Sequence, residues 1–480
     1  MTISNSSNLN VKDISFLNDI KSVAVIGASK KRDYRFLSSY AELFKGKIYA
    51  INPKLKEIPE YDNVEVYPSL LDIPGQVDYV YFTIPAKRVF DVMDHCVEKG
   101  VKLASFFTSG FSDIGTAEGR ERERELLKRA KNKVRILGPN CLGLHYPKMG
   151  LSWTSNYLSV KGNIGFVSQS GGLVNYVMMH TRELGLNISK AFSFGNGADL
   201  DFVDILYFLS NDPETEIILC YLEGIKANRG YDLQKVLEQN KKPIIMVKGG
   251  RTSPGARATN THTASISGEN KLWSSLFKQY NIIEVESLEQ LVHAAYLIEH
   301  YGFFNIEKMA VVSASGGYGV ILTDLVEKAG IEVPPFSPHI QEKLNSGYVP
   351  VGSSSQNPLD LASIMFFVQE THNVLDIALS DENIDGMIMD MPSFYFKQTQ
   401  FGFMPNFEDG HIETATLGYK YNKPLITIVQ KHNSPVEQER LMKKLAKKNL
   451  PHFSDPLHVI PLLPIISKYS RNRKKMENNS

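Results

Sequence analysis

The chain contains 480 residues, of which 42% are apolar and 22% are charged, and its net charge is +1. This length and balance predict a globular protein of about three domains, without a bulk charge that attracts nucleic acid or an anionic membrane. No apolar run reaches the roughly 18–20 residues that cross a bilayer, and the first residues show no secretory signal. The three cysteines are scattered, which suits a reducing compartment and favours neither a disulfide framework nor a zinc site. We therefore expect a cytoplasmic protein with no metal site, no membrane partner and no nucleic-acid partner.

The first third of the chain alternates short apolar runs with segments of helical period. Strands are expected at residues 23–26, 48–51, 80–84, 103–107 and 134–137. These runs lack polar alternation, so both faces of each strand are expected to be buried in a parallel sheet covered by helices. The pattern predicts a Rossmann-like α/β domain over residues 13–148.

Two further βα series follow and look like copies of each other. Strands are expected at residues 164–167, 216–221 and 243–247, and again at 310–312, 386–389 and 424–429. Ser168–Gly172 in the first copy aligns with Ser313–Gly317 in the second. Such an internal repeat constrains the fold strongly. It predicts flavodoxin-like domains over residues 150–305 and 306–465, followed by a disordered basic tail over 466–480.

The repeated Ser-x-Ser-Gly-Gly segment lies between a buried strand and a helix. Free backbone N–H groups and the helix dipole converge there, and glycines allow a phosphoryl group to come close. A tight turn with an N-cap serine is the alternative, and two copies in one chain favour the phosphate site. The candidate phosphate-binding residues are Ser168, Ser170, Gly171, Ser315, Gly316 and Gly317.

A long polar segment at residues 249–268 carries a single histidine, His262. Its composition predicts a mobile loop at the carboxyl edge of the second sheet. A lone loop histidine is usually only solvated, but the third domain has no matching segment, which favours a function. An imidazole can attack a phosphoryl group, and a carboxylate at its other nitrogen fixes the reactive tautomer. Glu223, which closes an apolar strand at the same edge, is the candidate carboxylate, although a solvated strand-end glutamate is an equal alternative.

The first domain lacks a complete dinucleotide fingerprint, because only Gly27-Ala28-Ser29 follows its opening strand. The next strand ends in Asn52-Pro53-Lys54, where an NAD enzyme usually carries an acid, and a lysine there suits a phosphorylated ribose such as that of coenzyme A. Later strand ends carry small or turn-forming residues and outline a groove for an extended ligand. These residues include Pro85, Ser109, Gly110, Asn140 and Cys141.

Together these segments resemble the α subunit of ADP-forming acetyl-CoA synthetases, relatives of succinyl-CoA synthetase, over about residues 15–465. In the first domain the matching segments are Val25–Ser29, Asn52–Lys54, Pro85–Lys87, Ser109–Phe111 and Gly138–Gly143. In the later domains they are Ser168–Gly171, Gly195–Asp199, Tyr221–Gly224, Thr261–Thr263, Ser315–Gly317 and Asn357–Leu361. Their order and spacing carry the resemblance, since no single motif decides it.

The resemblance implies a CoA-binding domain followed by two domains of the succinyl-CoA synthetase type. His262 would be phosphorylated, Glu223 would orient it, and the two Ser-Gly turns would hold the phosphoryl group. The implied CoA site consists of Gly27, Ser29, Lys30, Asn52, Pro53, Lys54, Pro85, Ser109, Gly110, Asn140 and Cys141. The implied reaction is acyl-CoA + ADP + phosphate ⇌ carboxylic acid + CoA + ATP, through an acyl phosphate and phosphorylated His262.

Two features depart from the family or qualify the function. Lys30–Phe36 is a basic segment where the family usually supplies a further glycine, and its basic residues could equally serve the phosphates of CoA. No ATP-grasp domain is recognisable, so ATP, ADP and Mg²⁺ are expected on a separate β subunit in an α₂β₂ assembly. The alternatives are a CoA-sensing regulatory module, an NAD-dependent oxidoreductase, and a structural partner with a vestigial His262. The absent dinucleotide glycines oppose the oxidoreductase, and the retained Glu223 and His262 oppose the structural partner.

Overall fold

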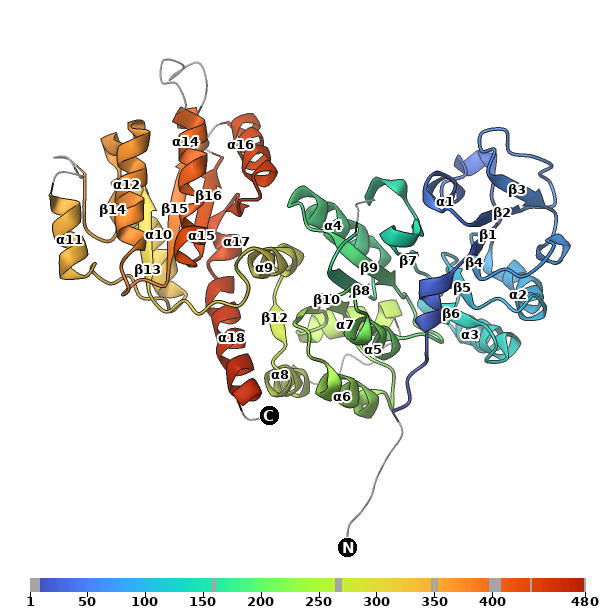
Figure 1. Ribbon diagram of the computed structural model, residues 1–480. Helices are drawn as coiled ribbons and strands as arrows, with labels where there is room; N and C mark the ends of the chain where they lie inside the picture. Colours follow the sequence, from blue (N-terminus) through green and yellow to red (C-terminus); the bar gives the residue numbers. More distant parts are fainter. Residues whose placement is uncertain are drawn as a thin grey trace, which may run out of the picture. The chain divides into compact units, whose positions relative to one another are not determined.

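The computed structural model describes residues 9–157, 161–263, 270–346, 349, 353–396, 407–431 and 434–478, with the side chains of 260–263, 363 and 395 outside the description. The chain divides into two compact units, Met1–Leu288 and Glu289–Ser480 (Figure 1). Three mainly parallel sheets confirm the α/β fold class. Within the described ranges no helix is long and apolar enough to cross a membrane.

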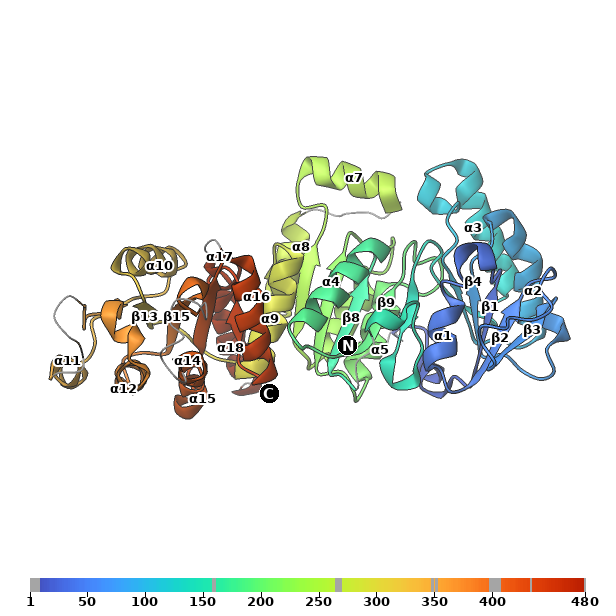
Figure 2. The same cartoon turned by 90° about the horizontal axis from the view of Figure 1, so that it is seen from above.

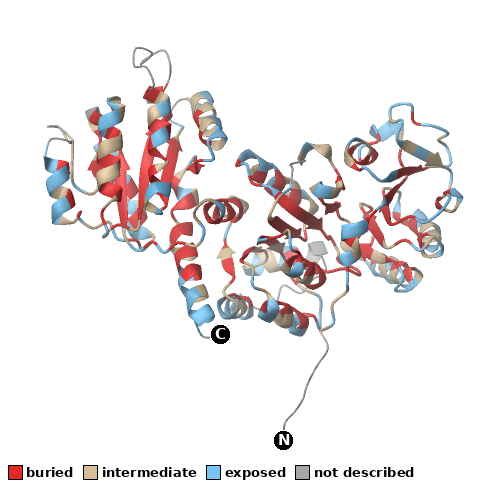
Figure 3. Cartoon of the chain, in the orientation of Figure 1, coloured by how far each residue is buried: buried red, intermediate tan, exposed pale blue. Residues whose placement is uncertain are grey.

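The first sheet is parallel throughout and has the strand order β3-β2-β1-β4-β5-β6. Its strands are β1 Ser22–Ile26, β2 Lys47–Ile51, β3 Val64–Tyr67, β4 Tyr79–Phe82, β5 Leu103–Phe106 and β6 Arg135–Leu137, and its helices are α1 Leu37–Leu43, α2 Val89–Glu98 and α3 Ala117–Ala130. The central strands are buried along their whole length, as Figure 3 shows in red. The strand order reverses between β1 and β4, and ligands bind such sheets outside that point.

The second sheet has the order β12-β11-β10-β8-β9-β7, in which β7 runs antiparallel to β9. Its strands are β7 Gly143–His145, β8 Ile164–Ser168, β9 Ile188–Ser193, β10 Ile217–Leu222, β11 Ile244–Lys248 and β12 Ile283–Val285. Its helices are α4 Gly171–Glu183, α5 Phe202–Asn211, α6 Gly230–Gln239, α7 Ser253–Thr263 and α8 Asn270–Gln279. Here the order reverses between β8 and β10, whose carboxyl ends carry Ser170 and Glu223.

Helix α7 corrects the prediction of a mobile loop over residues 249–268 for residues 253–263, and residues 264–268 lie outside the described part of the chain. Pro254 lies in its first turn, where the missing N–H costs nothing, and Ala256 and Ala258 favour a helix. The small, polar composition of this segment favours a loop but is equally compatible with a surface helix. Figure 2 shows α7 above the second sheet, where it lies against the 3₁₀ turn η5 (Ser112–Ile114).

The third sheet belongs to the second unit and has the parallel order β14-β13-β15-β16-β17. Its strands are β13 Met309–Ser313, β14 Leu359–Asp360, β15 Gly386–Pro392, β16 Leu425–Gln430 and β17 His452–Phe453. Its helices are α9 Leu288–Tyr301, α10 Gly316–Lys328, α11 Pro338–Asn345, α12 Val368–Leu379, α14 Phe407–Thr414, α15 Leu417–Tyr421, α16 Pro435–Lys447, α17 Pro456–Val459 and α18 Leu462–Asn478. The β13–α10 connection repeats the β8–α4 connection, as the internal repeat predicts.

Helix α18 corrects the prediction of a disordered tail over residues 466–480, because the helix continues to Asn478; residues 479 and 480 lie outside the described part of the chain. Ile466 and Tyr469 are buried at helical spacing, which the basic composition of the following residues obscures. The Tyr469 ring lies 5.2 Å from that of Phe303, and the Arg473 guanidinium lies 4.7 Å from the same Phe303 ring. Apolar and cation–π contacts therefore order most of this segment.

Candidate active site

The turn after β1 closes tightly at the reversal point of the first sheet. Gly27 has φ +91°, and a Cβ atom there would lie 2.6 Å from Ile84 Cγ2 and 3.0 Å from Thr83 Oγ1. A side chain at this position would therefore be strained and would collide with the turn after β4. The Asn52 side chain donates to the Ala28 carbonyl at 2.8 Å and fixes the turn from the next strand.

Two adjoining pockets lie along this edge of the first unit. One, of about 490 Å³, is lined by Gly27, Ser29, Arg32, Tyr34 and Arg35, among other residues. The other, of about 440 Å³, is lined by Ser109, Asn140 and Cys141 from the first domain and by Ser170 and Gly171 from the second. Arg35 and Phe107 line both pockets. The structure thus brings strand-end residues of the first domain together with the predicted phosphate-binding turn.

Some predicted CoA-site residues do not line these two pockets. They are Lys30, Asn52, Pro53, Lys54, Pro85 and Gly110. Lys30 instead forms an exposed ion pair with Glu60 at 3.0 Å, and Asn52 supports the Gly27 turn from behind.

The turn between β8 and α4 is organised by its two serines. Ser168 Oγ donates to the Ser170 carbonyl at 2.9 Å and accepts from the Ser170 N–H at 3.2 Å. Ser170 is the N-cap of α4, and its side chain accepts from the Leu173 N–H at 3.4 Å. Gly172 is exposed, and a Cβ atom there would meet nothing within 4 Å. The α4 N-terminus therefore presents backbone N–H groups and the positive end of the helix dipole to the second pocket.

Glu223 is buried at the end of β10 and is held from several sides. Its backbone N–H donates to Gln169 Oε1 at 2.9 Å, and the Gly224 N–H donates to the same oxygen at 3.3 Å. Lys248 Nζ donates to the Glu223 carbonyl at 2.6 Å, and the Tyr221 hydroxyl donates to Glu223 Oε1 at 3.3 Å. The residue is therefore fixed next to the α4 turn, which Gln169 belongs to.

Lys248 stands out because its ammonium group is buried at the end of β11. Burial, reinforced by Arg251 and opposed by Glu223, lowers the pKa of Lys248 to about 8. Its Nζ lies 5.2 Å from the Trp273 ring centroid. The sequence does not single out Lys248, and it marks Gln169 only as part of the matched Ser168–Gly171 segment, because their roles arise from contacts with distant strand ends.

The predicted nucleophile, His262, lies on α7, but its side chain lies outside the described residues. The backbone of α7 lies against η5, whose Ser112 lines a further pocket together with Gln169 and Gly224. The pairing of Glu223 with His262 stays a prediction.

Cys141 forms part of the wall of the second pocket. Burial raises the pKa of the Cys141 thiol to about 12, and its Sγ lies 3.4 Å from the Leu137 carbonyl oxygen. The thiol is therefore protonated at neutral pH and is a packing group rather than a nucleophile.

The copied turn in the second unit has a different electrostatic setting. Ser313 Oγ donates to the Ser315 carbonyl at 2.8 Å, as in the first copy. However, a Cβ atom on Gly316 would lie 2.7 Å from Asp360 Oδ2, so a carboxylate lies against the start of α10. Burial, with a contribution from Asp360, raises the pKa of the neighbouring Asp390 to about 6. Phosphate binding by Ser315–Gly317 stays a prediction, and these carboxylates oppose a second anion.

Comparisons with known proteins match both parts of the first unit. A CoA binding domain model matches residues 21–147, and a model of the succinyl-CoA ligase like flavodoxin domain matches residues 161–298. The alpha subunit of acetate–CoA ligase [ADP-forming] I from Pyrococcus furiosus is 31% identical over 466 residues, which cover 95% of this chain and 97% of that subunit. The chain belongs to the ADP-forming acetate–CoA ligase family.

Other family members differ in length. Acetate–CoA ligase [ADP-forming] I from Archaeoglobus fulgidus is 31% identical over 94% of this chain, which spans only 63% of that relative. A solved structure of the dinucleotide forming acetyl-coenzyme A synthetase 1 of Ca. Korarchaeum cryptofilum, in complex with phosphate and ADP, superimposes on this chain with a TM-score of 0.81 and 30% sequence identity. The superposition covers 97% of this chain and 99% of that one.

The family domains coincide with the two sides of the candidate active site. The pocket residues up to Leu142 fall within the matched CoA-binding domain, and those from Gln169 onwards fall within the matched ligase domain. In this member of the ADP-forming acetate–CoA ligase family, the two domains therefore meet at the α4 turn.

Proposed function

We propose that this chain is the α subunit of an ADP-forming acyl-CoA synthetase that interconverts acyl-CoA, ADP and phosphate with a carboxylic acid, CoA and ATP. The observation that carries this proposal is the second pocket, which combines first-domain strand ends with the α4 N-terminus. An extended thiol ligand and a phosphoryl group would meet there. The relatives' names support both the reaction class and the subunit role, since the P. furiosus protein is named as the alpha subunit of an ADP-forming acetate–CoA ligase.

The proposed reaction proceeds in two chemical steps on this chain. Phosphate attacks the thioester carbonyl, which forms an acyl phosphate and releases CoA. His262 then attacks the phosphorus, and the carboxylate product leaves. The α4 N-terminus, with Ser168, Ser170 and Gly171, stabilises the phosphoryl charge during both steps. Glu223 orients the imidazole, because a carboxylate at one ring nitrogen leaves the other free to attack.

The remaining roles are divided between the domains and a partner. The proposed domains are 13–148 for CoA, 150–305 for the phosphohistidine and 306–465 for the second ligase-type domain. CoA lies along the turns that carry Gly27, Ser29, Ser109, Asn140 and Cys141, which line the two pockets. For the predicted residues that do not line them, we propose contacts with the parts of CoA that extend beyond the pockets: Lys30, Asn52, Pro53, Lys54, Pro85 and Gly110. An ATP-grasp β subunit in an α₂β₂ assembly binds the nucleotide with Mg²⁺, and phosphorylated His262 passes its phosphoryl group to ADP. The use of CoA and ATP favours the cytoplasm.

A steady-state assay tests this function. The chain is mixed with an ATP-grasp partner, ATP, Mg²⁺, CoA and a panel of carboxylic acids, and ADP release and thioester formation are followed. We expect both products to appear together and to be lost in His262→Ala, whereas His339→Ala, at an exposed position on α11, retains activity. CoA binding without turnover for any acid would instead favour the regulatory CoA-sensing module.

A further inference from the structure

The loop Gly195–Asp199, which follows β9 of the second sheet, packs against residues of the first domain. Its backbone N–H groups at Asn196 and Ala198 donate to the Pro139 and Gly138 carbonyls at 3.0 and 2.8 Å. Gly195 has φ +54°, and a Cβ atom there would lie 2.3 Å from the carbonyl oxygens of Pro139 and Asn140. The loop therefore lies directly on the turn that lines the second pocket, and no side chain fits between them.

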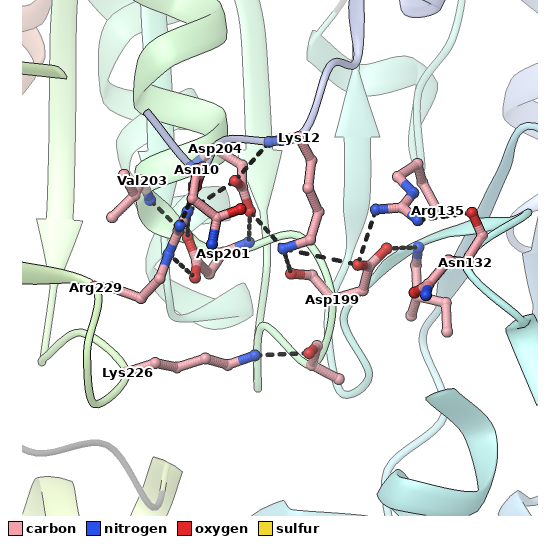
Figure 4. A network of polar contacts seen from close by, with 12 residues as sticks. Asn10, Lys12, Asn132, Arg135, Asp199, Asp201, Val203, Asp204, Lys226 and Arg229 are labelled. Carbon is pink, nitrogen blue, oxygen red and sulfur yellow. Dashed lines mark hydrogen bonds and ion pairs between the residues drawn. The ribbon is translucent and has the colours of Figure 1, made fainter. Parts of the chain in front are cut away.

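At one end of this loop, Asp199 forms hydrogen bonds with strand β6 at the edge of the first sheet (Figure 4). Its carboxylate accepts from Arg135 Nη1 at 3.2 Å and from the Ile136 N–H at 2.9 Å. Lys12 Nζ donates to the Asp199 carbonyl at 2.8 Å. These contacts lie at the β6 edge and involve no pocket residue, which gives this end a docking role.

The Asn196 end makes a different set of contacts. Asn196 Nδ2 lies 3.0 Å from Ser112 Oγ, 3.1 Å from Asp113 Oδ1 and 2.9 Å from Glu123 Oε2. Three oxygens around one atom, two of them from carboxylates, require a hydrogen-bond donor at that position. Ser112 Oγ in turn donates to Glu123 Oε2 at 2.6 Å.

Asp113 links Asn196 to the Ser109–Phe111 turn through hydrogen bonds. Its carboxylate accepts from the Gly110 N–H at 2.9 Å and from the Phe111 N–H at 2.8 Å. Arg122 Nη1 donates to the Gly110 carbonyl at 2.9 Å from the other side. Asn196 and Ser109 both line the second pocket, together with the α4 turn.

We propose that Asn196 is a positioning residue that sets the Ser109–Phe111 turn relative to the α4 N-terminus, and so sets the affinity of the assembled site for CoA. The inference rests on the proposed function for the identity of the ligand. The amide acts through Asp113, because it holds that carboxylate in the position from which it accepts from Gly110 and Phe111.

The variant Asn196→Asp removes the donor at almost constant shape and turns an oxygen towards Asp113 and Glu123. Its CoA dissociation constant is expected to rise about tenfold or more, since losing the partner of a charged group commonly exceeds the roughly 1.4 kcal/mol that a tenfold change represents. The double variant Asn196→Asp/Glu123→Gln returns an amide donor to the cluster, so part of the affinity is expected to return. Asp199→Asn makes the converse change in the same loop and is expected to lower the unfolding midpoint while leaving CoA affinity within about twofold.

Calorimetric titration of the full chain with CoA, alongside phosphorylation of the chain by ATP and the partner, tests the inference. We expect phosphorylated Asn196→Asp to need about ten times more CoA than the phosphorylated wild type, with acetate, for half-maximal discharge. Equal CoA affinity in Asn196→Asp and wild type would overturn the inference and leave the proposed function standing. So would equal weakening by Asp199→Asn, because docking alone would then explain the effect. A wild type that binds CoA more tightly than Asn196→Asp but is never phosphorylated would support the inference and refute the proposed synthetase.

Discussion

Lys190 of β9 is fully buried, and its ammonium group is surrounded by acidic and aromatic groups. Its Nζ lies 2.9 Å from both carboxylate oxygens of Asp212, 2.7 Å from Glu214 Oε2 and 4.1 Å from the Tyr146 ring centroid. The variant Lys190→Met keeps most of the apolar stem but leaves the two carboxylates without their main cation. Removing one partner from a buried ion pair costs about 3–5 kcal/mol, so we expect the free energy of unfolding of the first unit to fall by that amount.

Lys148 provides a matched control because it contacts the same carboxylate from the surface. Its side chain is 60% exposed and pairs with Glu214 Oε1, whereas the side chain of Lys190 is 0% exposed. An exposed pair contributes at most about 1 kcal/mol, so Lys148→Met is expected to have a small effect. Urea unfolding of both variants, followed by circular dichroism, measures the difference.

The difference in the free energy of unfolding between wild type and Lys190→Met should also depend on pH. Burial acts to raise the pKa of Glu214, but hydrogen bonds from Lys148, Lys190 and Tyr146 outweigh it and lower the pKa to about 2. A lowered folded-state pKa stabilises the fold above the unfolded value of about 4.3, and this stabilisation is lost as the pH falls towards 2. The gap between wild type and Lys190→Met should therefore narrow below about pH 4. A loss below about 1 kcal/mol at neutral pH, equal to that of Lys148→Met, would refute the reasoning.

Three further predictions concern other parts of the chain. Arg35→Ala should weaken CoA binding about tenfold in calorimetry, with a smaller effect on pantetheine, because Arg35 lines both pockets and a guanidinium suits phosphate; equal effects on both ligands would contradict this role. Ser170→Ala should destabilise the first unit by about 1 kcal/mol in urea and slow labelling of His262, since it removes the α4 N-cap; an unchanged midpoint would contradict it. His300→Gln should flatten the acid-side stability profile of the second unit. Burial, with help from His452, lowers the pKa of His300 to about 4, so its stabilising effect is present above about pH 6.5 and is lost towards pH 4; an unchanged profile would contradict this.

The sequence predicts the strands that are buried on both faces, because their apolar runs are continuous. Strand β9 has no such signal, since Ser189, Lys190 and Ser193 interrupt it. These residues are buried because partners from distant segments satisfy them, as Asp212 does for Lys190 and Thr215 does for Ser189 at 2.7 Å. A partner 22 or more residues away leaves no mark on local periodicity.

The candidate site also contains some residues that the local sequence predicts and others that it does not. Ser168 and Ser170 are predictable because a strand, a short turn and a helix cap occur within one segment. Gln169 is not, because its hydrogen bonds with Glu223 and Gly224 depend on the pairing of β8 with β10. Arg35 belongs to a basic segment suited to phosphates, but only the structure places it in both pockets. The Gly195–Asp199 motif marks Asn196 as part of a pattern, but only the structure shows its three oxygen partners.

Phosphorylation of His262 is the most direct test of the central claim. The chain, with an ATP-grasp partner and Mg²⁺, is incubated with γ-labelled ATP, and label on the chain is followed through acid and base treatment. The account predicts acid-labile, base-stable label that is absent in His262→Ala, present in His339→Ala, and discharged by CoA plus a carboxylic acid. Label that persists in His262→Ala, or no label on a chain that binds CoA beside an active partner, would contradict it.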